Sequence, residues 1–330
     1  SVRGATTKKM IGFLLDLLQT VLLYAFLFSI LGYLIPLALQ NFVYKDANLK
    51  KRYPNAKWAL VSGASTGIGK AVSEKLAEQG FNVVLVALPD KNFDATFEEI
   101  SSAHPDQSFR RINIDLSRPG AGVDVADQVA DLPIDVVFSN AGYIVVGLFG
   151  DLPVETQMKN YHVNTTTAVE LTQKLTSRMI ERKAKGCIVF TSSPAGLIPC
   201  PTSAIYGATK AFLTNFASTL SVELRPEGID VLAFHPSPVN TNFYSGSTAQ
   251  KSNSLLFFKR TATTPQLIAE AMMSSVGRPL SDIRDQGYFS ICSHLLLKVV
   301  DYNLLTSVMS YFFFLFPEYQ TLQKERVKKQ

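Results

Sequence analysis

The stretch Trp58-Ala-Leu-Val-Ser-Gly-Ala-Ser-Thr-Gly-Ile-Gly-Lys-Ala71 decides the fold of this chain. It opens with a short apolar run typical of a buried strand and continues into three glycines, after which apolar residues recur at helical spacing (Ile68, Val72, Leu76). Glycine permits a tight turn from strand to helix and the close approach of a pyrophosphate. The free N–H groups and positive dipole end of the helix point at the same place. The stretch therefore predicts a dinucleotide-binding turn at Gly63, Gly67 and Gly69.

Strand and helix patterns alternate along the chain that follows. The predicted strands span residues 58–61, 81–87, 109–114, 134–139, 186–191, 229–234 and 288–291. The predicted helices after the glycine turn span residues 93–103, 122–131, 153–182, 204–225 and 264–277. Repeated strand–helix units indicate a doubly wound parallel sheet, so we expect an α/β, Rossmann-type domain of about seven strands. Its predicted limits are residues 55–291.

Charge is distributed unevenly over the 330 residues, which are 47% hydrophobic and carry a net charge of +5. Residues 1–58 have a net charge of +6 and the last eleven residues have +3, so the middle of the chain is acidic, near −4. Basic residues that flank two apolar ends favour anionic lipid headgroups over nucleic acid as a partner.

The three cysteines lie far apart, at Cys187, Cys200 and Cys292. An odd number at these distances does not make a disulfide framework, and the spacing is not that of metal ligands. We therefore expect no metal site and three small buried apolar side chains in a reducing compartment.

Residues 1–54 form a predicted membrane anchor and linker. The 19 residues Val21–Leu39 carry no charge, and about 20 apolar residues span a bilayer's hydrocarbon core. A cleaved signal peptide would have a shorter apolar core, and a buried core helix would have a polar face. A re-entrant hairpin that turns near Gly32 or Pro36 remains an alternative. More basic residues follow the segment than precede it, which predicts a cytosolic catalytic domain.

Residues 292–330 form a predicted membrane-associated apolar helix with a basic tail. The apolar run Leu304–Phe316 is too short to span a bilayer, but its aromatic residues suit a membrane interface. The basic residues that follow suit anionic headgroups. The alternative is a helix packed against the catalytic domain or against the second subunit of a homodimer.

Three further positions lie at the carboxyl ends of predicted strands, where ligands bind in such sheets. Asp115 is placed to accept a hydrogen bond from an adenine amino group, or to cap a helix. Asn140-Ala-Gly142 closes the fourth strand. The second strand ends in Ala87-Leu-Pro-Asp-Lys91, with no acid directly at its end to bind a ribose hydroxyl. This absence favours NADP over NAD, with Lys70 and Lys91 as possible sources of positive charge.

A second group of residues, around position 200, has the side chains that catalysis would need. Tyr206 and Lys210 lie four residues apart at the start of a predicted helix and so share one face. A phenol with a pKa near ~10 is a poor proton donor and acceptor at neutral pH, and a neighbouring lysine cation favours the phenolate. Ser193, thirteen residues before Tyr206 at a strand end, is placed to hydrogen-bond a substrate carbonyl. The combination of these residues at these offsets, downstream of the glycine motif, indicates a catalytic site for proton transfer beside a substrate carbonyl.

With these motifs in place, the chain resembles the classical short-chain dehydrogenase/reductase family over about residues 55–285. The resemblance implies that Tyr206 is the general acid, that Lys210 lowers its pKa and holds the nicotinamide ribose, that Ser193 polarises the carbonyl, and that Asn164 keeps a water in the proton relay. It implies cofactor contacts, besides those of Tyr206 and Lys210, from Gly63, Ser65, Thr66, Gly67, Ile68, Gly69, Asp115, Leu116, Asn140, Ala141, Gly142, Pro236, Val239 and Thr241. The chain departs from the family pattern at Leu88, Ser139 and Ser237.

Within the family, the chain resembles membrane-bound very-long-chain 3-oxoacyl-CoA reductases and the related 17β-hydroxysteroid dehydrogenases. Shared features are a Lys-Trp-Ala start to the first strand, an Asn-Val-Val-Leu second strand and Thr264-Pro265 before a late helix. The resemblance implies NADPH-dependent reduction of a long-chain 3-oxoacyl-CoA at a membrane, with the endoplasmic reticulum as the expected organelle. Alternatives are a steroid, retinoid or 3-ketosphinganine oxidoreductase, or a reductase-like structural subunit of a membrane complex. The loop at about 240–262 is the expected lipid contact.

Overall fold

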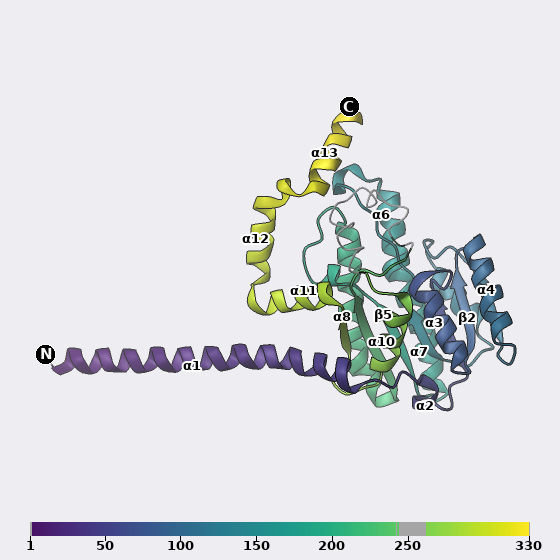
Figure 1. Ribbon diagram of the computed structural model, residues 1–330, viewed down its shortest axis with the longest axis horizontal. Helices are drawn as coiled ribbons and strands as arrows, with labels where there is room; N and C mark the ends of the chain where they lie inside the picture. Colours follow the sequence, from purple (N-terminus) through teal and green to yellow (C-terminus); the bar gives the residue numbers. More distant parts are fainter. Residues whose placement is uncertain (1, 242, 244–261, 330) are drawn as a thin grey trace.

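A seven-stranded parallel sheet forms the centre of the molecule (Figure 1). The computed structural model describes residues 2–241, 243 and 262–329. The strand order is β3-β2-β1-β4-β5-β6-β7. The strands are β1 (Trp58–Ser62), β2 (Asn82–Ala87), β3 (Phe109–Asn113), β4 (Ile134–Ser139), β5 (Gly186–Thr191), β6 (Ile229–Pro236) and β7 (Ile283–Gln286). The prediction of a doubly wound α/β fold is confirmed.

Helices cover both faces of the sheet. One face packs against α3 (Gly67–Glu78), α4 (Lys91–Ala103) and α10 (Pro265–Ser275), and the other against α5 (Ala121–Gln128), α7 (Thr167–Glu181) and α8 (Ala204–Leu224). Successive strand residues alternate between the two cores, as Leu60 and Val61 do in β1. Because both faces are buried, the strands read as continuous apolar runs.

The last strand differs from its prediction. We expected it at residues 288–291, but β7 is Ile283–Gln286, and Tyr288 begins the helix α11 (Tyr288–Val299). The two middle residues of β7, Arg284 and Asp285, are charged and yet buried. Their charges are satisfied by hydrogen bonds from distant parts of the chain, so no apolar pattern marks this strand in the sequence.

The helix predicted over residues 153–182 is divided into two. It consists of α6 (Val154–Tyr161), a π-helical turn (His162–Thr166) and α7. A π-turn inserts one extra residue into the helix and is often found at functional sites. Here it carries Asn164, one of the predicted site residues.

The N-terminal segment forms one long helix, α1 (Val2–Ala38), followed by a π-helical turn at Leu39–Val43. Figure 1 shows α1 projecting away from the body of the molecule. The helix continues through Gly32 and Pro36, so the chain does not form the alternative hairpin there. Among the described residues, Lys8–Val43 is the one segment that is long and apolar enough to cross a membrane.

The end of α1 and its π-turn dock onto the catalytic domain. Gln40 is 3% exposed and donates hydrogen bonds to the Ser281 hydroxyl and to the carbonyl of Ile283. Arg284 donates in return to the Gln40 carbonyl, at 2.6 Å. The segment predicted as a linker also contains a short helix, α2 (Leu49–Arg52). The residues before Ser29, from Lys8 onward, are almost all exposed.

The C-terminal segment consists of α11, α12 (Tyr302–Phe312), a 3₁₀ turn (Phe313–Leu315) and α13 (Pro317–Lys329). Figure 1 shows α12 running crosswise to the direction of α1. Cys292 of α11 is exposed and Cys200 is partly buried, so the expectation of three buried cysteines holds only for Cys187. The prediction was wrong for Cys292 because α11 lies at the surface and only some of its side chains, such as Ser290, pack inward.

Candidate active site

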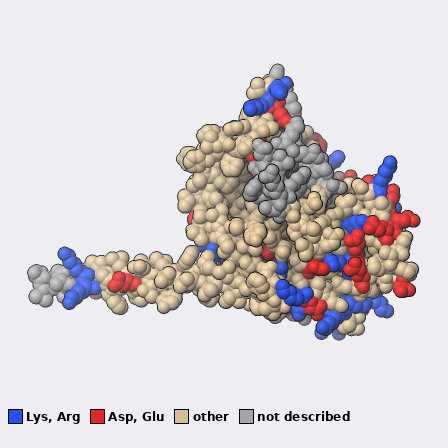
Figure 2. Space-filling model, in the orientation of Figure 1, with Lys and Arg blue, Asp and Glu red and all other residues tan. Residues whose placement is uncertain are grey.

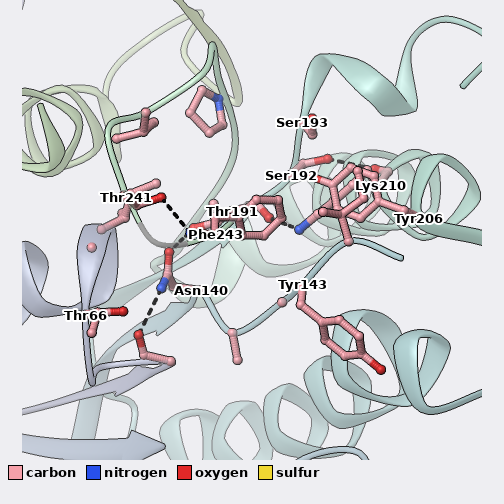
Figure 3. A pocket seen from close by; sticks show the side chains of 18 of the residues that line it. Thr66, Asn140, Tyr143, Thr191, Ser192, Ser193, Tyr206, Lys210, Thr241 and Phe243 are labelled. Atoms are coloured by element: carbon pink, nitrogen blue, oxygen red, sulfur yellow. Dashed lines mark hydrogen bonds between the residues drawn. The ribbon is translucent and has the colours of Figure 1, made fainter. Parts of the chain in front are cut away.

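A cavity of about 770 Å³ lies at the carboxyl ends of the strands. Fourteen of the predicted site residues line it: Gly63, Ser65, Thr66, Gly67, Ile68, Asn140, Ala141, Gly142, Ser193, Tyr206, Lys210, Pro236, Val239 and Thr241. Figure 3 shows Thr66, Asn140 and Thr241 toward one end of this cavity and Ser193, Tyr206 and Lys210 toward the other. The elongated arrangement suits a dinucleotide whose reactive ring lies beside Tyr206.

The glycine turn has no room for side chains. A Cβ on Gly69 would lie 2.1 Å from the carbonyl oxygen of Gly63, so the helix α3 can begin this close to the turn only with glycine there. Gly67 has φ = +58°, and a Cβ there would lie 2.8 Å from the Thr241 methyl group. Gly69 does not line the cavity, so its role is to pack the helix against the turn.

Asn140 ties together the ends of three strands. Its backbone N–H donates to the Ser62 hydroxyl of β1 at 3.0 Å, and its side-chain amide donates to the Ser62 carbonyl at 3.3 Å. Its side-chain oxygen accepts a hydrogen bond from the Thr191 hydroxyl of β5, also at 3.0 Å. These hydrogen bonds hold together the strand ends that line the cavity between the glycine turn and the end of β5.

Lys210 is buried beside Tyr206. Its Nζ lies 5.6 Å from the centre of the Tyr206 ring and donates a 2.7 Å hydrogen bond to the Thr191 carbonyl. Burial lowers the pKa of Lys210 to about 8. At pH 7 a group with this pKa is still protonated in about nine of ten molecules. The cavity therefore contains a lysine cation next to a phenol.

Ser193 lies two residues after the end of β5 and caps a short 3₁₀ turn, Pro194–Gly196. Its hydroxyl oxygen accepts a hydrogen bond from the Ala195 N–H at 3.2 Å, which leaves its proton available for a ligand in the cavity. The β5 end thus presents Ser193 toward the same cavity as the start of α8 presents Tyr206.

Asn164 lies behind the cavity wall and does not line it. Its side chain bonds to both backbone groups of Tyr143, accepting from the N–H at 3.1 Å and donating to the carbonyl at 3.2 Å, and it donates to the Thr209 hydroxyl. A Cβ on Gly142 would lie 3.1 Å from the Asn164 oxygen and 3.3 Å from Lys210 Nζ. Gly142 therefore keeps the path between these two polar groups open.

Two further predicted cofactor residues, Asp115 and Leu116, do not line the cavity. The Asp115 carboxylate accepts a hydrogen bond from the Ser117 N–H at 2.8 Å, and this bond lowers the pKa of Asp115. The backbone carbonyl of Leu116 accepts a hydrogen bond from the Thr167 hydroxyl. Asp115 thus stabilises the turn after β3. It does not cap the helix that follows, because Gly120 is the residue at the N-terminal cap of α5.

Both lysines considered for cofactor charge are absent from the cavity lining. Lys70 forms ion pairs with Glu99 at 2.6 Å and with Glu74 at 3.6 Å. Leu88, which follows β2, lines the cavity and is 54% exposed.

Sequence reasoning did not assign several cavity residues. Tyr143, Ile144, Val145 and Val146 follow the Asn-Ala-Gly motif and form an apolar wall, and Phe243 lies with its ring 6.0 Å from that of Tyr206. An apolar run directly after a strand's carboxyl end was the available signal for the first four. In the expected lipid-contacting loop, 240–262, residues 242 and 244–261 lie outside the described residues.

Comparison with known proteins agrees with this geometry. Residues 57–252 match the family model described as short chain dehydrogenase. A very-long-chain 3-oxoacyl-CoA reductase of Meyerozyma guilliermondii is 33% identical over 213 residues, which are 60% of this chain and 61% of that protein. The chain thus spans less than two thirds of the length of that relative.

Solved structures show the same fold. A 7beta-hydroxysteroid dehydrogenase superposes with a TM-score of 0.69 at 23% identity, over 80% of this chain and 99% of the other. A short-chain dehydrogenase from Sphingobium yanoikuyae in complex with NADPH superposes with a TM-score of 0.63 at 25% identity, over 74% and 96% of the two chains. The chain belongs to the short-chain dehydrogenase family of nicotinamide-dependent oxidoreductases.

Proposed function

We propose that this protein uses NADPH to reduce a lipid ketone, the 3-oxo group of a long-chain 3-oxoacyl-CoA. The main support for this proposal is that Ser193, Tyr206 and Lys210 line one cavity. The glycine turn lines the same cavity. A hydroxyl donor, a phenol and a buried ammonium are the groups that protonation of a carbonyl oxygen requires.

The residues of the cavity fit a nicotinamide dinucleotide. Thr66, Gly67 and Ile68 at the N-terminus of α3 line the cavity, so the free N–H groups of that helix end are placed as pyrophosphate binding requires. Lys210 would hold the nicotinamide ribose, and Pro236, Val239 and Thr241 would lie along the other side. The bound cofactor supplies the hydride.

The chain's own groups handle the proton and the carbonyl. Ser193 donates a hydrogen bond to the substrate oxygen and orients it toward Tyr206. The Tyr206 hydroxyl donates its proton to that oxygen as negative charge develops there. The Lys210 cation stabilises the resulting phenolate. Asn164, held by Tyr143 and Thr209, keeps a polar path toward Lys210 through which Tyr206 regains its proton.

The preference for NADPH rests on the residues directly after β2. An acid there would bind the free ribose 2′-hydroxyl of NADH and repel a 2′-phosphate. Leu88 occupies this position at the edge of the cavity. Asp90 is directed elsewhere, because its carboxylate caps α4 by accepting a hydrogen bond from the Phe93 N–H at 2.7 Å. The first position after β2 therefore carries no negative charge against NADPH.

The apolar wall supports a lipid substrate. Ile144, Val145, Val146 and Phe243 present hydrocarbon to the cavity beside Tyr206. A long acyl chain gains free energy by burying its methylene groups against such a wall, by about 0.8 kcal/mol for each. The name of the Meyerozyma guilliermondii relative, a very-long-chain 3-oxoacyl-CoA reductase, points to the same substrate class.

The terminal helices support attachment to a membrane, with the endoplasmic reticulum as the proposed organelle and the catalytic domain on its cytosolic side. Figure 2 shows that the charged side chains of this view gather on the side of the body away from α1 and near the outer end of α1, whereas the rest of α1 and the neighbouring surface are largely uncharged. The exposed part of α1 from Met10 to Phe28 is about 28 Å long, close to the thickness of a bilayer's hydrocarbon core.

The helix α12 suits the membrane surface. It runs crosswise to α1, so when α1 spans the bilayer α12 lies along the interface (Figure 1). Its exposed apolar side chains include Leu304, Val308, Tyr311 and Phe312. Such a helix buries its apolar face among the headgroups, with the basic residues of α13 close to anionic lipid.

The proposal is tested with the full-length protein in detergent. NADPH oxidation is measured against 3-oxoacyl-CoA of several chain lengths, steroid ketones, retinal and 3-ketosphinganine. We expect the highest kcat/KM for a long-chain 3-oxoacyl-CoA. A preference for another ketone would reassign the substrate, and the absence of turnover with every ketone would favour a structural subunit.

A further inference from the structure

A chain of buried hydrogen bonds connects the anchor helix with the back of the active site. Its central group is Asp285 of β7, which is 3% exposed. One carboxylate oxygen accepts from His235 Nδ1 of β6 at 2.8 Å and from the Ser290 hydroxyl at 2.7 Å. The other is 2.8 Å from His294 Nδ1 and accepts from the Tyr33 hydroxyl of α1 at 3.0 Å.

These contacts keep Asp285 charged although it is buried. Burial alone would raise the pKa of its carboxyl group, but the hydrogen bonds from His235 and His294 hold that pKa well below its usual value. The carboxylate in turn orients the His235 ring, because it accepts the proton on Nδ1. His235 is fully buried, so its other nitrogen, Nε2, also needs a partner.

That partner is the Thr214 hydroxyl of α8, at 2.8 Å from His235 Nε2. The Thr214 oxygen also lies 3.0 Å from the Lys210 carbonyl and 2.8 Å from the Ser192 hydroxyl. The Ser192 hydroxyl donates to the same Lys210 carbonyl at 2.7 Å. His235 is therefore one threonine away from the backbone of the lysine that lies beside Tyr206.

The hydroxyl groups of Thr214 and Ser192 each have one proton to donate. With the neutral His235 ring protonated at Nδ1, Nε2 accepts, so the Thr214 proton is directed to it. The Ser192 proton is then the one directed to the Lys210 carbonyl. In this way His235 determines which hydroxyl holds the Lys210 backbone.

The Lys210–Ser192 bond is half of a clamp between β5 and α8. In the other half, Lys210 Nζ donates to the carbonyl of Thr191, the residue before Ser192. The clamp sets the separation of Ser193, which follows β5, from Tyr206, which lies on α8. Because a displacement of about 1 Å between reacting groups can lower turnover a hundredfold, the stiffness of this clamp matters for catalysis.

Asp285, His235 and Thr214 have the order of a carboxylate–imidazole–hydroxyl triad, but Thr214 does not line the cavity. Its hydroxyl contacts protein groups: the ring of His235, the carbonyl of Lys210 and the hydroxyl of Ser192. This arrangement suits a group that holds others in place better than a nucleophile.

We propose that Asp285, His235 and Thr214 are positioning residues for the clamp that Lys210 forms with Thr191 and Ser192. Docking of the anchor helix adds the Tyr33 hydrogen bond to Asp285 and so completes the network. The proposal rests on the proposed reductase function for its kinetic consequences. The anchor then has two roles: it attaches the enzyme to a membrane, and its docked end stiffens the catalytic site. A positioning role predicts that the loss of these contacts lowers kcat with little change in KM.

The first test compares variants of Thr214. Thr214→Val keeps the side-chain shape and removes the hydroxyl, and we expect kcat to fall about tenfold, with KM for NADPH and ketone within about twofold of wild type. Thr214→Ser restores the hydroxyl and should recover most of kcat. The matched control is Thr172→Val in α7, where the hydroxyl is buried without a hydrogen-bond partner among the described residues. An unchanged kcat in Thr214→Val, or an equal loss in Thr172→Val, would overturn the proposal.

The second test asks whether the anchor belongs to the same network. Tyr33→Phe removes the hydroxyl that contacts Asp285 and retains the ring that stacks on His294. We expect a fewfold loss of kcat in the wild-type background and almost none in the Thr214→Val background, because coupled residues are non-additive. Tyr44→Phe is the control, since the Tyr44 hydroxyl donates to the Pro279 carbonyl outside the network. Additive losses, or equal losses in the control, would contradict the coupling.

Hydrogen exchange separates this inference from the proposed function. If wild-type protein turns over no ketone, the function is wrong, and exchange still tests the network without a substrate. Tyr33→Phe should accelerate amide exchange in the first turns of α8, around residues 206–214, as well as in α1 and α11. Acceleration confined to α1 and α11 would show that the network does not reach the active site.

Discussion

Lys210 directs its ammonium group to a point 5.6 Å from the centre of the Tyr206 ring, and both side chains are almost completely buried. The ammonium is held there by the Thr191 carbonyl. A cation in this position favours the phenolate that remains after Tyr206 has given up its proton. Both the proton transfer and the dependence of stability on pH should therefore depend on this pair.

Removing the phenol hydroxyl should stop catalysis without removing the cofactor site. Tyr206→Phe keeps the ring and its contact with Phe243. We expect kcat to fall by a factor of about 10³ or more, while NADPH binding, measured by fluorescence, stays within about threefold of wild type. Residual turnover near the wild-type value would remove Tyr206 from the mechanism.

Burial of Lys210 predicts a particular dependence of stability on pH. The pKa falls from 10.5 to about 8 on folding, so between these values the unfolded state binds more protons and stability rises with pH. Relative to Lys210→Met, wild-type protein should gain up to about 3 kcal/mol in free energy of unfolding between pH 7 and pH 10.5. Denaturant unfolding of both proteins, with Lys57→Met as the control for loss of an exposed charge, measures this difference. A difference that does not change with pH would show that Lys210 is not desolvated.

The residue that follows β2 should control the choice of cofactor. Wild-type protein should show a higher kcat/KM with NADPH than with NADH. Leu88→Asp places a carboxylate at the cavity edge, where it would bind a free ribose hydroxyl and repel a 2′-phosphate, and should shift the ratio toward NADH by about tenfold or more. Equal efficiency of the wild type with the two cofactors would refute the NADPH preference.

The docked end of the anchor predicts where the chain can be shortened. Removing residues 1–28 takes away the part of α1 in which residues 8–28 are almost all exposed, and the remaining protein should keep its melting temperature. Removing residues 1–45 also takes away Gln40 and Asn41, which accept hydrogen bonds from the buried Arg284 guanidinium. Because the buried Arg284 guanidinium would lose these hydrogen bonds, the free energy of unfolding should fall by about 2 kcal/mol or more. Equal stability of the two shortened proteins would show that the docking contacts contribute nothing.

Much of the fold was predictable because it follows from local patterns. The apolar strands, the glycine turn at Gly63–Gly69 and the Tyr206–Lys210 spacing each depend on residues close together in the chain. Many of the residues that line the cavity belong to these motifs, whereas the apolar wall and Phe243 do not. For Asp115 the sequence left two roles open, because a carboxylate after a strand can bind a ligand or cap a helix, and the sequence pattern is the same for both.

The features that were missed depend on contacts between distant residues. Strand β7 contains Arg284 and Asp285, whose burial depends in large part on hydrogen bonds with Gln40, His235 and Tyr33, all more than 45 positions away. No periodicity within residues 283–286 indicates this. The anchor was predicted as an independent segment for the same reason, since its apolar pattern contains no sign that residues 29–43 dock onto the domain.

The central claim is that hydride passes to the 3-oxo carbon of an acyl thioester while Tyr206 protonates the oxygen. The most direct measurement uses NADPH carrying deuterium at the transferable C4 position, with a long-chain 3-oxoacyl-CoA, and mass spectrometry of the product. Wild-type protein should form 3-hydroxyacyl-CoA with one deuterium on C3, and Tyr206→Phe should form almost none. Formation of no 3-hydroxyacyl-CoA by wild-type protein, or of product without deuterium, would contradict the account.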